Sequence, residues 1–362
     1  MKERLLLGPG PSPVAPRVTE AMAAPVLSHL DPEMMAILDD VRARLRRVFR
    51  ASDDALTLAI SGTGTSGMEA AVANLARPGT RALVVVSGYF GDRLAQMLER
   101  YGASVARLDV EWGRAFDPAH VERALKESPA EIVGMVHAET STGVINPVAD
   151  VCGIAARGGA FTIVDAVTSL GAQEVDVAGW GADVCYSCTQ KGLGAPSGLS
   201  PIVFSARARS QALATDGARS FYFDLRLLED YWIRRKYHHT ISAPLVYALR
   251  EALVAVEEEG LERRWARHRA THLTLVRCLD ELGLHLLPPP SERLWSLNAV
   301  VVPAGVNEAD VRHRLLNEFD IEIGSGLGPL AGRIWRVGLM GSGSTEQNVR
   351  RFISALTSAL AA

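Results

Sequence analysis

The 362-residue sequence lacks the features that would tie a protein to nucleic acid or to a membrane. Its formal net charge is -3, so it has no excess of the basic residues that neutralise phosphate backbones. No apolar run approaches the roughly 20 residues of a membrane-spanning helix. The N-terminus reaches Gly8 too early for a signal peptide. We therefore expect a cytoplasmic globular protein with neither nucleic acid nor a membrane as a partner.

Cysteine is also scarce, and its spacing argues against a metal site. Cys185 and Cys188 are spaced as in a redox pair or in half of a zinc site. The sequence contains no second pair of this kind and no pair of histidines nearby. On an alternating strand these two side chains would point to opposite faces, which disfavours a disulfide between them. We expect structural thiols and no metal.

An acidic residue is missing where a dinucleotide site would require one. The strand predicted for residues 56–60 runs into a glycine-rich turn that opens a helix, and the free N–H groups of such a turn suit a phosphate. Gly62, Gly64 and Gly67 match the spacing of a dinucleotide fingerprint, but the next predicted strand, residues 81–86, ends without a carboxylate. The pattern therefore favours a mononucleotide-sized phosphate, with a nicotinamide-dependent dehydrogenase as the lesser alternative.

Two candidate catalytic residues lie at the ends of apolar stretches. Lys191 follows the strand-like residues 183–190, and the small residues after it leave room around its amine. A lysine in this setting can form an imine with pyridoxal phosphate, although a surface lysine capping a turn is the simpler alternative. Asp165 ends the apolar stretch 161–165, where a buried carboxylate needs a cation or several donors. A protonated pyridine nitrogen would be such a partner.

Three further residues have a functional and a structural interpretation. Phe90, just after the strand at 81–86, either stacks on a flat ring or fills the core. Thr140 follows the apolar strand at 131–136, where ligands of parallel sheets gather, but hydroxyl residues also form turns. Arg336 lies in a strand-like segment that could aim its guanidinium at a substrate carboxylate, or it is a charge on a surface strand.

The order of the predicted elements indicates an α/β protein with two domains. Strands and helices alternate from residue 56 onward, two long amphipathic helices follow at 243–259 and 262–282, and shorter strands and helices alternate to the C-terminus. We predict an extended N-terminal segment, a large domain and a smaller α+β C-terminal domain, at residues 1–15, 16–260 and 261–362 respectively.

Several motifs are similar to those of one enzyme family. These are the phosphate turn, Val164-Asp-Ala-Val-Thr-Ser, Tyr186-Ser-Cys-Thr-Gln-Lys, Ser220-Phe-Tyr-Phe-Asp-Leu, Lys236-Tyr-His-His-Thr-Ile, Phe319-Asp-Ile-Glu-Ile-Gly-Ser-Gly-Leu-Gly-Pro and Ile334-Trp-Arg-Val-Gly-Leu-Met-Gly. Together they resemble the class V aminotransferases of PLP fold type I, and within these the alanine:glyoxylate (serine:pyruvate) branch. The resemblance extends from Leu5 to the C-terminus. It implies a large domain with a mostly parallel, seven-stranded sheet flanked by helices.

The resemblance also assigns roles to individual residues around pyridoxal 5'-phosphate. Lys191 would carry the internal aldimine, and Asp165 would pair with the pyridinium nitrogen. The remaining cofactor contacts would be Phe90 and Val167 on the ring faces, Thr140 near the phenolic oxygen, and Gly64, Thr65, Gln190, Tyr237 and Thr240 at the phosphate. Tyr237 and Thr240 would come from the partner subunit of a homodimer. Arg336 would bind the substrate carboxylate opposite the backbone of Gly8.

The implied reaction is transamination between alanine or serine and glyoxylate or pyruvate. Another class V enzyme, either an aspartate aminotransferase or a cysteine desulfurase or lyase, is the alternative within the family. Desulfurases typically place a histidine before the lysine, where this sequence has Gln190, and they need a mobile nucleophilic cysteine. The identity of the amino donor and acceptor stays open.

Overall fold

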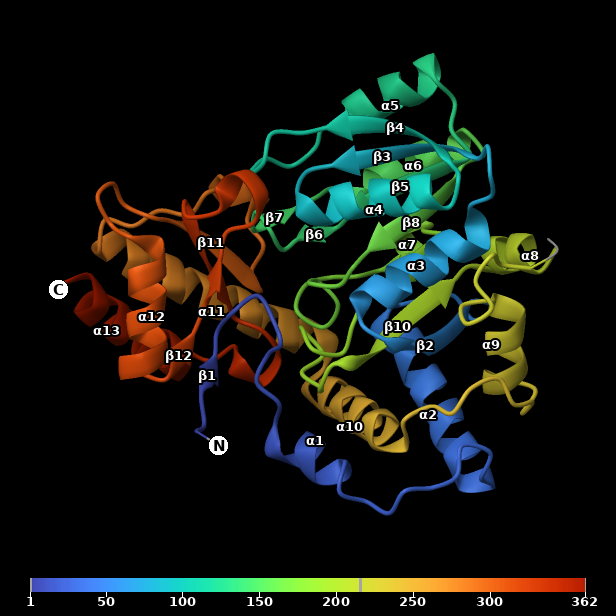
Figure 1. The fold of residues 1–362 in the computed structure, drawn as a ribbon, viewed down its shortest axis with the longest axis horizontal. Coiled ribbons are helices and arrows are strands. Elements are labelled where there is room, and N and C mark those ends of the chain that lie inside the picture. Colours follow the sequence, from blue (N-terminus) through green and yellow to red (C-terminus); the bar gives the residue numbers. More distant parts are fainter. Residues whose placement is uncertain (1, 215–216, 362) are drawn as a thin grey trace.

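A seven-stranded sheet forms the centre of the larger part of the protein (Figure 1). The computed structural model describes residues 2–214 and 217–361. The strand order is β2-β10-β9-β8-β5-β3-β4. The bounds are β2 (Leu56–Gly62), β3 (Arg81–Val86), β4 (Ser104–Asp109), β5 (Ile132–Val136), β8 (Phe161–Asp165), β9 (Val184–Tyr186) and β10 (Gly198–Phe204). Strands β9, β8, β5, β3 and β4 run parallel, and β10 is antiparallel to both its neighbours. The predicted mostly parallel seven-stranded sheet is confirmed.

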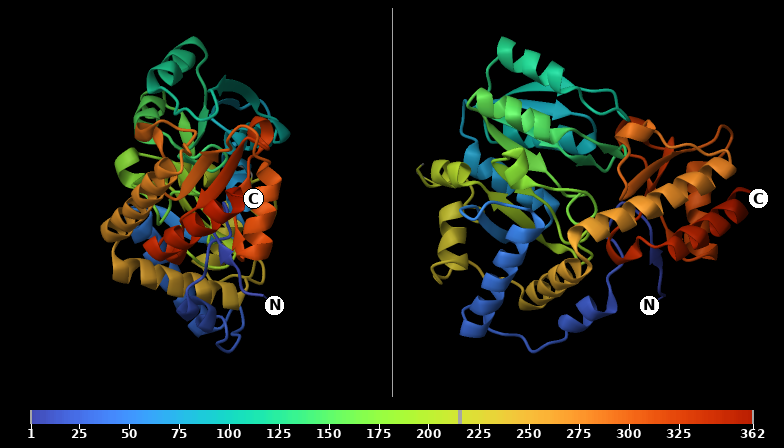
Figure 2. Two further views of the ribbon diagram at one scale, coloured as in Figure 1. Left: turned by 90° about the vertical axis from the view of Figure 1, so that its left-hand side faces the viewer. Right: turned by 180° about the vertical axis from the view of Figure 1, so that it is seen from behind.

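Helices cover both faces of this sheet, which explains why nearly all residues of its central strands are buried and most of them are apolar. Helices α3 and α4 lie on the face turned to the viewer in Figure 1, and α6 lies on the face seen in the right-hand view of Figure 2. The helices of this part are α1 (Pro16–Ala21), α2 (Pro32–Val48), α3 (Gly64–Leu75), α4 (Tyr89–Arg100), α5 (Pro118–Glu127), α6 (Val148–Arg157), α7 (Val177–Trp180), α8 (Ala206–Ala214), α9 (Leu225–Trp232) and α10 (Ala243–Glu259). A two-stranded ribbon joins β6 (Ala138–Glu139) to β7 (Val144–Ile145).

Capping residues explain where several helices begin. The Asp31 side chain accepts a hydrogen bond from Glu33 N–H at the start of α2, and the Asp117 side chain accepts one from Ala119 N–H at the start of α5. Each cap is followed by a proline, whose fixed φ suits the first helical turn and whose missing N–H costs nothing there. An aspartate followed by a proline therefore marks the start of both helices.

The C-terminal part has its own small sheet and its own apolar core. Its antiparallel sheet has the order β11-β14-β13. In chain order, the helices and strands of this part are α11 (Leu261–Glu281), β11 (Leu297–Val301), α12 (Glu308–Glu318), β12 (Ile321–Glu322), β13 (Gly324–Ser325), β14 (Ile334–Gly338) and α13 (Glu346–Leu360). A separate cluster of buried side chains, including Leu275, Val337 and Phe352, holds these elements together. The domain boundary after residue 260 stays a prediction.

The N-terminal segment links the two parts. Strand β1 (Leu5–Leu6) pairs in parallel with β12, and Leu7 is buried in the C-terminal core. The chain then crosses to the large sheet, where Ser12 N–H donates to the carbonyl of Gln190 at 2.9 Å. The backbone just before Lys191 is therefore tied directly to the N-terminal segment.

Two details differ from the expectations drawn from the sequence. Strand β9 ends at Tyr186, so Lys191 follows an irregular segment and not a strand reaching to residue 190. The Ser187 hydroxyl donates to the carbonyl of Ala166 at 3.0 Å, which ties this segment to the chain that follows β8. Strand β10 was not predicted, because it contains Gly198 and Pro201, residue types that are uncommon inside strands.

Candidate active site

Seven of the predicted site residues line one pocket at the carboxyl ends of β8 and β9. They are Gly64, Thr65, Phe90, Asp165, Val167, Gln190 and Lys191, and Thr63, Met68, Arg93 and Cys188 complete the lining. The pocket has a volume of about 190 Å³. A cavity of about 150 Å³ holds a benzene-sized molecule, so this one has room for a single aromatic ring. The ends of parallel strands bring these distant segments together, as expected for an open α/β sheet.

Lys191 differs from every other lysine in the chain. Lys2, Lys126 and Lys236 expose 62 to 71% of their side chains and pair with carboxylates. Lys191 is buried, and its Nζ donates to the carbonyl of Pro9. Burial lowers the pKa of this amine, because the charged form is poorly solvated. The lowered pKa favours the neutral form of the amine relative to an exposed lysine, and the neutral amine is the form that makes an imine.

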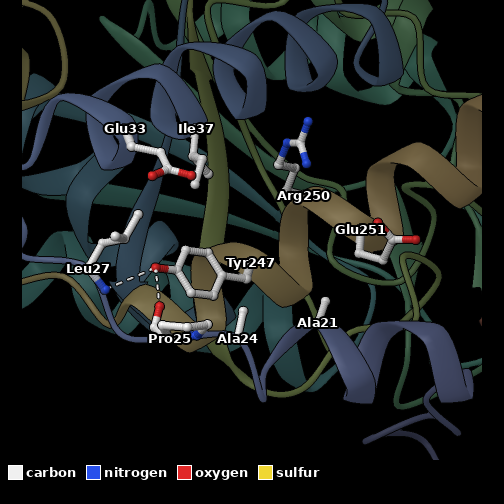
Figure 3. Close-up of a pocket in the computed structure, with 9 residues that line it drawn as sticks. All are labelled: Ala21, Ala24, Pro25, Leu27, Glu33, Ile37, Tyr247, Arg250 and Glu251. Atoms are coloured by element: carbon white, nitrogen blue, oxygen red, sulfur yellow. Dashed lines mark hydrogen bonds between the residues drawn. The ribbon is translucent and has the colours of Figure 1, made fainter.

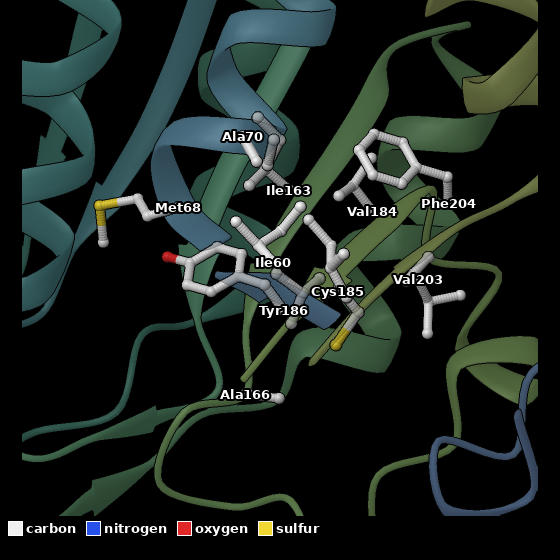
Figure 4. Close-up of a cluster of buried hydrophobic side chains, with 14 of the residues drawn as sticks. Ile60, Met68, Ala70, Ile163, Ala166, Val184, Cys185, Tyr186, Val203 and Phe204 are labelled. Atoms are coloured by element: carbon white, nitrogen blue, oxygen red, sulfur yellow. The ribbon is translucent and has the colours of Figure 1, made fainter. Parts of the chain in front are cut away.

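Asp165 presents a buried carboxylate to the same pocket. Its Oδ1 accepts a hydrogen bond from Val167 N–H and its Oδ2 accepts one from the Tyr186 hydroxyl, both at 2.8 Å. Tyr186 belongs to the cluster of buried side chains around β2 and β9 (Figure 4). Burial raises the pKa of Asp165 to about 6, and the two hydrogen bonds oppose this rise. A cationic ring nitrogen in the pocket would stabilise the charged carboxylate.

The glycine-rich turn begins a helix, as predicted. Helix α3 starts at Gly64, so its first N–H groups are free of intrahelical partners. A Cβ on Gly64 would come within 2.8 Å of Val167 Cγ2, which explains the glycine beside the pocket. Oε1 of Gln190 is buried without a hydrogen-bond partner among the described residues. A polar ligand in this pocket would satisfy both groups.

A buried glutamate that the sequence analysis missed fixes Phe90. Helix α4 begins beside Glu139, whose Oε2 accepts hydrogen bonds from Phe90 N–H at 3.2 Å and Gly91 N–H at 3.3 Å. Oε1 of Glu139 accepts two more from Ser141, its backbone N–H and its hydroxyl. Burial raises the pKa of this carboxyl, and its donors oppose that rise. Glu139 therefore holds the first turn of α4 and sets the position of the Phe90 ring.

Arg336 lies on β14 with its guanidinium buried near the pocket. Its Nε donates to the carbonyl of Ser325 at 2.6 Å, and its Nη1 donates to the carbonyl of Thr140 at 3.4 Å. Burial lowers the pKa of Arg336 to about 10. No ion pair to Arg336 occurs within residues 2–214 and 217–361. A buried guanidinium that bonds only carbonyl oxygens retains donors for an anionic ligand.

The remaining predicted residues lie outside the lining of this pocket. The Thr140 hydroxyl shares a hydrogen bond with that of Thr168. Gly8 sits against Glu322, whose carboxylate would overlap a Cβ at this position. Tyr237 is 63% exposed and Thr240 is also exposed, and neither lines the pocket of Lys191.

A second cavity, of about 320 Å³, lies between α1, α2 and α10 (Figure 3). The Tyr247 hydroxyl bridges its rim, accepting from Leu27 N–H and donating to the carbonyl of Pro25, both at 3.1 Å. None of the predicted site residues lines it. The chemistry therefore centres on the pocket of Lys191.

Comparisons with known proteins agree with this geometry. The family model described as Aminotransferase class-V matches residues 6–339. This chain belongs to the class V aminotransferase family. It is 38% identical to the (S)-ureidoglycine–glyoxylate transaminase of Bacillus subtilis, over 99% of this chain and 90% of the relative. It is 39% identical to the alanine–glyoxylate aminotransferase of Oryctolagus cuniculus, over 99% and 92% respectively.

The same fold occurs in a solved aminotransferase structure. The alanine–glyoxylate aminotransferase of Nostoc sp. superimposes with a TM-score of 0.98 at 43% identity, and the match covers 99% of this chain and 96% of the other. The predicted PLP fold type I is confirmed, and the chain is an aminotransferase whose family implies pyridoxal phosphate. The alternative of a nicotinamide-dependent dehydrogenase is therefore wrong.

The residues that line the pocket of this class V aminotransferase are chemically suited to bind pyridoxal phosphate. It combines a buried amine, a buried carboxylate that forms no ion pair with any described residue, and a helix N-terminus in a space for one ring. Phe90 and Val167 both line it, so they can meet the two faces of a ring. The roles of individual residues toward the cofactor remain predictions.

The cysteines of the aminotransferase are free thiols. Cys185 and Cys188 are both buried and unbonded to each other. Burial raises the pKa of Cys188 to about 12 and that of Cys185 well above its ordinary value. Across residues 2–214 and 217–361 we find no group of three or more His, Cys, Asp or Glu placed to hold a metal ion, and no helix with the length and apolar character of a bilayer span.

Proposed function

We propose that this chain transfers the amino group of a small L-amino acid, alanine or serine, to a small 2-oxo acid, glyoxylate or pyruvate. The observation that carries the proposal is the pairing of the buried Lys191 and Asp165 in one pocket, with the buried Arg336 nearby. The relatives named above act on glyoxylate by their names, which supports glyoxylate as an acceptor. Alanine is named as the donor of one of them.

The protein side of the reaction follows from these residues. Pyridoxal phosphate, when bound, supplies an electron-withdrawing ring that stabilises negative charge at the alpha carbon of the amino acid. The Asp165 carboxylate favours the protonated state of the ring nitrogen, on which that withdrawal depends. Burial lowers the pKa of the Lys191 amine, and its Nζ can accept the proton that leaves the alpha carbon. Arg336 would orient the substrate by binding its carboxylate with two parallel hydrogen bonds.

A second copy of the chain would complete the site. Tyr237 is 63% exposed, and the exposed rings of Phe221 and Tyr222 lie in the same stretch of sequence. Large exposed apolar side chains in one region are typical of an interface between subunits. We propose a homodimer in which Tyr237 and Thr240 of one subunit reach the phosphate of the other. We also propose that the enzyme is cytoplasmic.

The alternatives within the family are less well supported. A desulfurase needs a reactive cysteine, but burial raises the pKa of both Cys185 and Cys188, which keeps these thiols protonated. An aspartate aminotransferase must bind two substrate carboxylates. Only Arg336 was predicted from the sequence to bind one.

A screen of amino donors against 2-oxo acids tests the proposed function. Purified protein with pyridoxal phosphate is assayed with alanine, serine, aspartate, glycine and (S)-ureidoglycine as donors, against glyoxylate, pyruvate and 2-oxoglutarate. We expect the highest kcat/KM for alanine or serine with glyoxylate or pyruvate. A preference for aspartate and 2-oxoglutarate would contradict the proposal. A preference for (S)-ureidoglycine would retain glyoxylate as acceptor and replace the donor.

A further inference from the structure

The residues predicted to bind the cofactor phosphate carry no formal positive charge. Gly64, Thr65 and Gln190 are neutral, and so are Tyr237 and Thr240. A phosphate monoester carries a charge of about -1.5 to -2 at neutral pH. The Lys191 amine is predicted to bond the cofactor's carbonyl carbon and so is committed elsewhere. Holding such an anion in a partly buried pocket favours a cation close to it.

Arg93 is the other cation that lines the pocket. It lies one turn after Phe90 on α4, and its Nη1 donates to the Thr65 hydroxyl oxygen at 2.9 Å. Its guanidinium carbon lies 5.1 Å from the centroid of the Phe90 ring and 5.3 Å from that of Tyr89. These contacts hold the guanidinium between two aromatic rings and the first turn of α3.

The hydrogen bonding of Arg93 leaves it available for an anion. Its neighbour Arg107, also near α4, pairs with Asp92 and Asp109. Arg93, by contrast, contacts the Thr65 hydroxyl and the rings of Tyr89 and Phe90. In the described part of the chain, no carboxylate lies within ion-pair distance of it. A guanidinium has five N–H donors in a fork that matches phosphate oxygens, so most of its donors remain to be used.

We propose that Arg93 is the residue that supplies the positive charge for the cofactor phosphate. Its hydrogen bond to Thr65 places it beside the start of α3, where the N–H groups and the helix dipole also favour an anion. Its contact with Phe90 couples the phosphate end of the pocket to the ring end. This inference rests on the proposed function, because it requires pyridoxal phosphate in this pocket.

A comparison of pyridoxal phosphate with pyridoxal tests this role. Pyridoxal carries the same ring and aldehyde but no phosphate. Apo-protein is titrated with each ligand, and the dissociation constant is taken from the absorbance of the lysine adduct. The variants are Arg93→Gln, Arg93→Lys and the control Arg100→Gln, which removes an exposed arginine from the end of the same helix. Thermal melts confirm that each variant is folded.

We expect Arg93→Gln to bind pyridoxal phosphate roughly ten- to a hundredfold more weakly, which corresponds to the loss of a hydrogen bond to a charged group. Its affinity for pyridoxal should stay within about twofold of the wild type. The affinity of Arg93→Lys for pyridoxal phosphate should lie between those of the wild type and Arg93→Gln. Arg100→Gln should bind both ligands as the wild type does.

Three results would overturn the proposal. Equal weakening for both ligands would show that Arg93 acts only through Phe90. Unchanged affinity for pyridoxal phosphate in Arg93→Gln would show that the charge is not used. A wild-type protein that binds neither ligand would overturn the cofactor assignment itself, and with it both the proposed function and the role of Arg93.

Discussion

The hydroxyl of Tyr186 donates a 2.8 Å hydrogen bond to Oδ2 of Asp165, and the two residues are direct partners in the parallel pairing of β9 with β8. Both side chains are buried. The hydrogen bond favours the charged form of Asp165, against the effect of burial. The register of two neighbouring strands therefore helps to set the charge that Asp165 presents to the pocket.

Tyr186→Phe should lower both the turnover number and the stability of the folded protein. Without the hydroxyl, the pKa of Asp165 rises further, so the carboxylate is charged less often and supports the ring nitrogen less well. We expect kcat to fall roughly tenfold and the free energy of unfolding to fall by about 1 to 3 kcal/mol, the cost of leaving one buried polar group unpaired. The control is Tyr101→Phe, which removes a tyrosine hydroxyl that donates to the Glu69 carboxylate at 3.0 Å. An equal loss of kcat in both variants would contradict the role of Tyr186.

The stability of the cofactor-free protein should depend on the titration of Asp165. Burial raises its pKa from 3.8 to about 6, so the folded chain binds this proton more tightly than the unfolded chain does. The contribution of Asp165 is therefore most favourable below about pH 4, and it is lost as the pH rises through about 6.

Denaturation of wild type and Asp165→Asn between pH 4 and pH 7 measures this contribution. The asparagine does not titrate, so the difference in unfolding free energy between the two proteins should change by about 2 kcal/mol over this range. Wild type should lose stability relative to the variant as the pH rises. A difference that stays constant with pH would show that Asp165 keeps an ordinary pKa.

Arg336→Lys should weaken the binding of substrates through their carboxylates. A lysine keeps the charge but cannot form two parallel hydrogen bonds. We expect KM to rise roughly tenfold for the amino acid and for the 2-oxo acid, with a smaller change in kcat. Arg333→Lys, at an exposed position just before β14, serves as the control. A normal KM for both substrates of Arg336→Lys would exclude this arginine as the carboxylate site.

Gly10→Ala should reduce the reactivity of Lys191. Gly10 has φ +110°, and a Cβ there would lie 2.7 Å from both Cδ and Cε of Lys191. The control Gly305→Ala shares the positive φ, at +81°, but its Cβ would meet nothing within 4 Å. Both variants should lose about 1 kcal/mol of stability from backbone strain. Only Gly10→Ala should bind pyridoxal phosphate more slowly or more weakly, and an equal effect in both would leave the N-terminal segment without a role at the lysine.

Features that depend on neighbours in the sequence could be predicted. The apolar run that ends in Asp165 became a buried strand of the sheet, and the glycine-rich turn opened α3 at Gly64. Both follow from local patterns, because strand burial and helix starts are decided within a few residues. The carboxyl ends of parallel strands then brought Asp165 and Lys191 into one pocket.

Features that depend on distant partners could not be predicted in this way. Glu139 contacts Phe90 N–H across 49 positions, and the carbonyl of Pro9 meets Lys191 across 182. Arg93 was indistinguishable in the sequence from the many arginines on solvated helix faces. Its place beside the pocket becomes evident only from the packing of α3 and α4, where its guanidinium contacts both Thr65 and the Phe90 ring.

The most direct test of the account is to find which lysine binds the cofactor. Protein loaded with pyridoxal phosphate is reduced with borohydride, digested and mapped by mass spectrometry, so that each of Lys2, Lys126, Lys191 and Lys236 is examined. We expect one pyridoxyl group per chain, on Lys191, and no visible absorbance band of the lysine adduct in Lys191→Ala. A label on one of the three exposed lysines, with Lys191 unmodified, would contradict it.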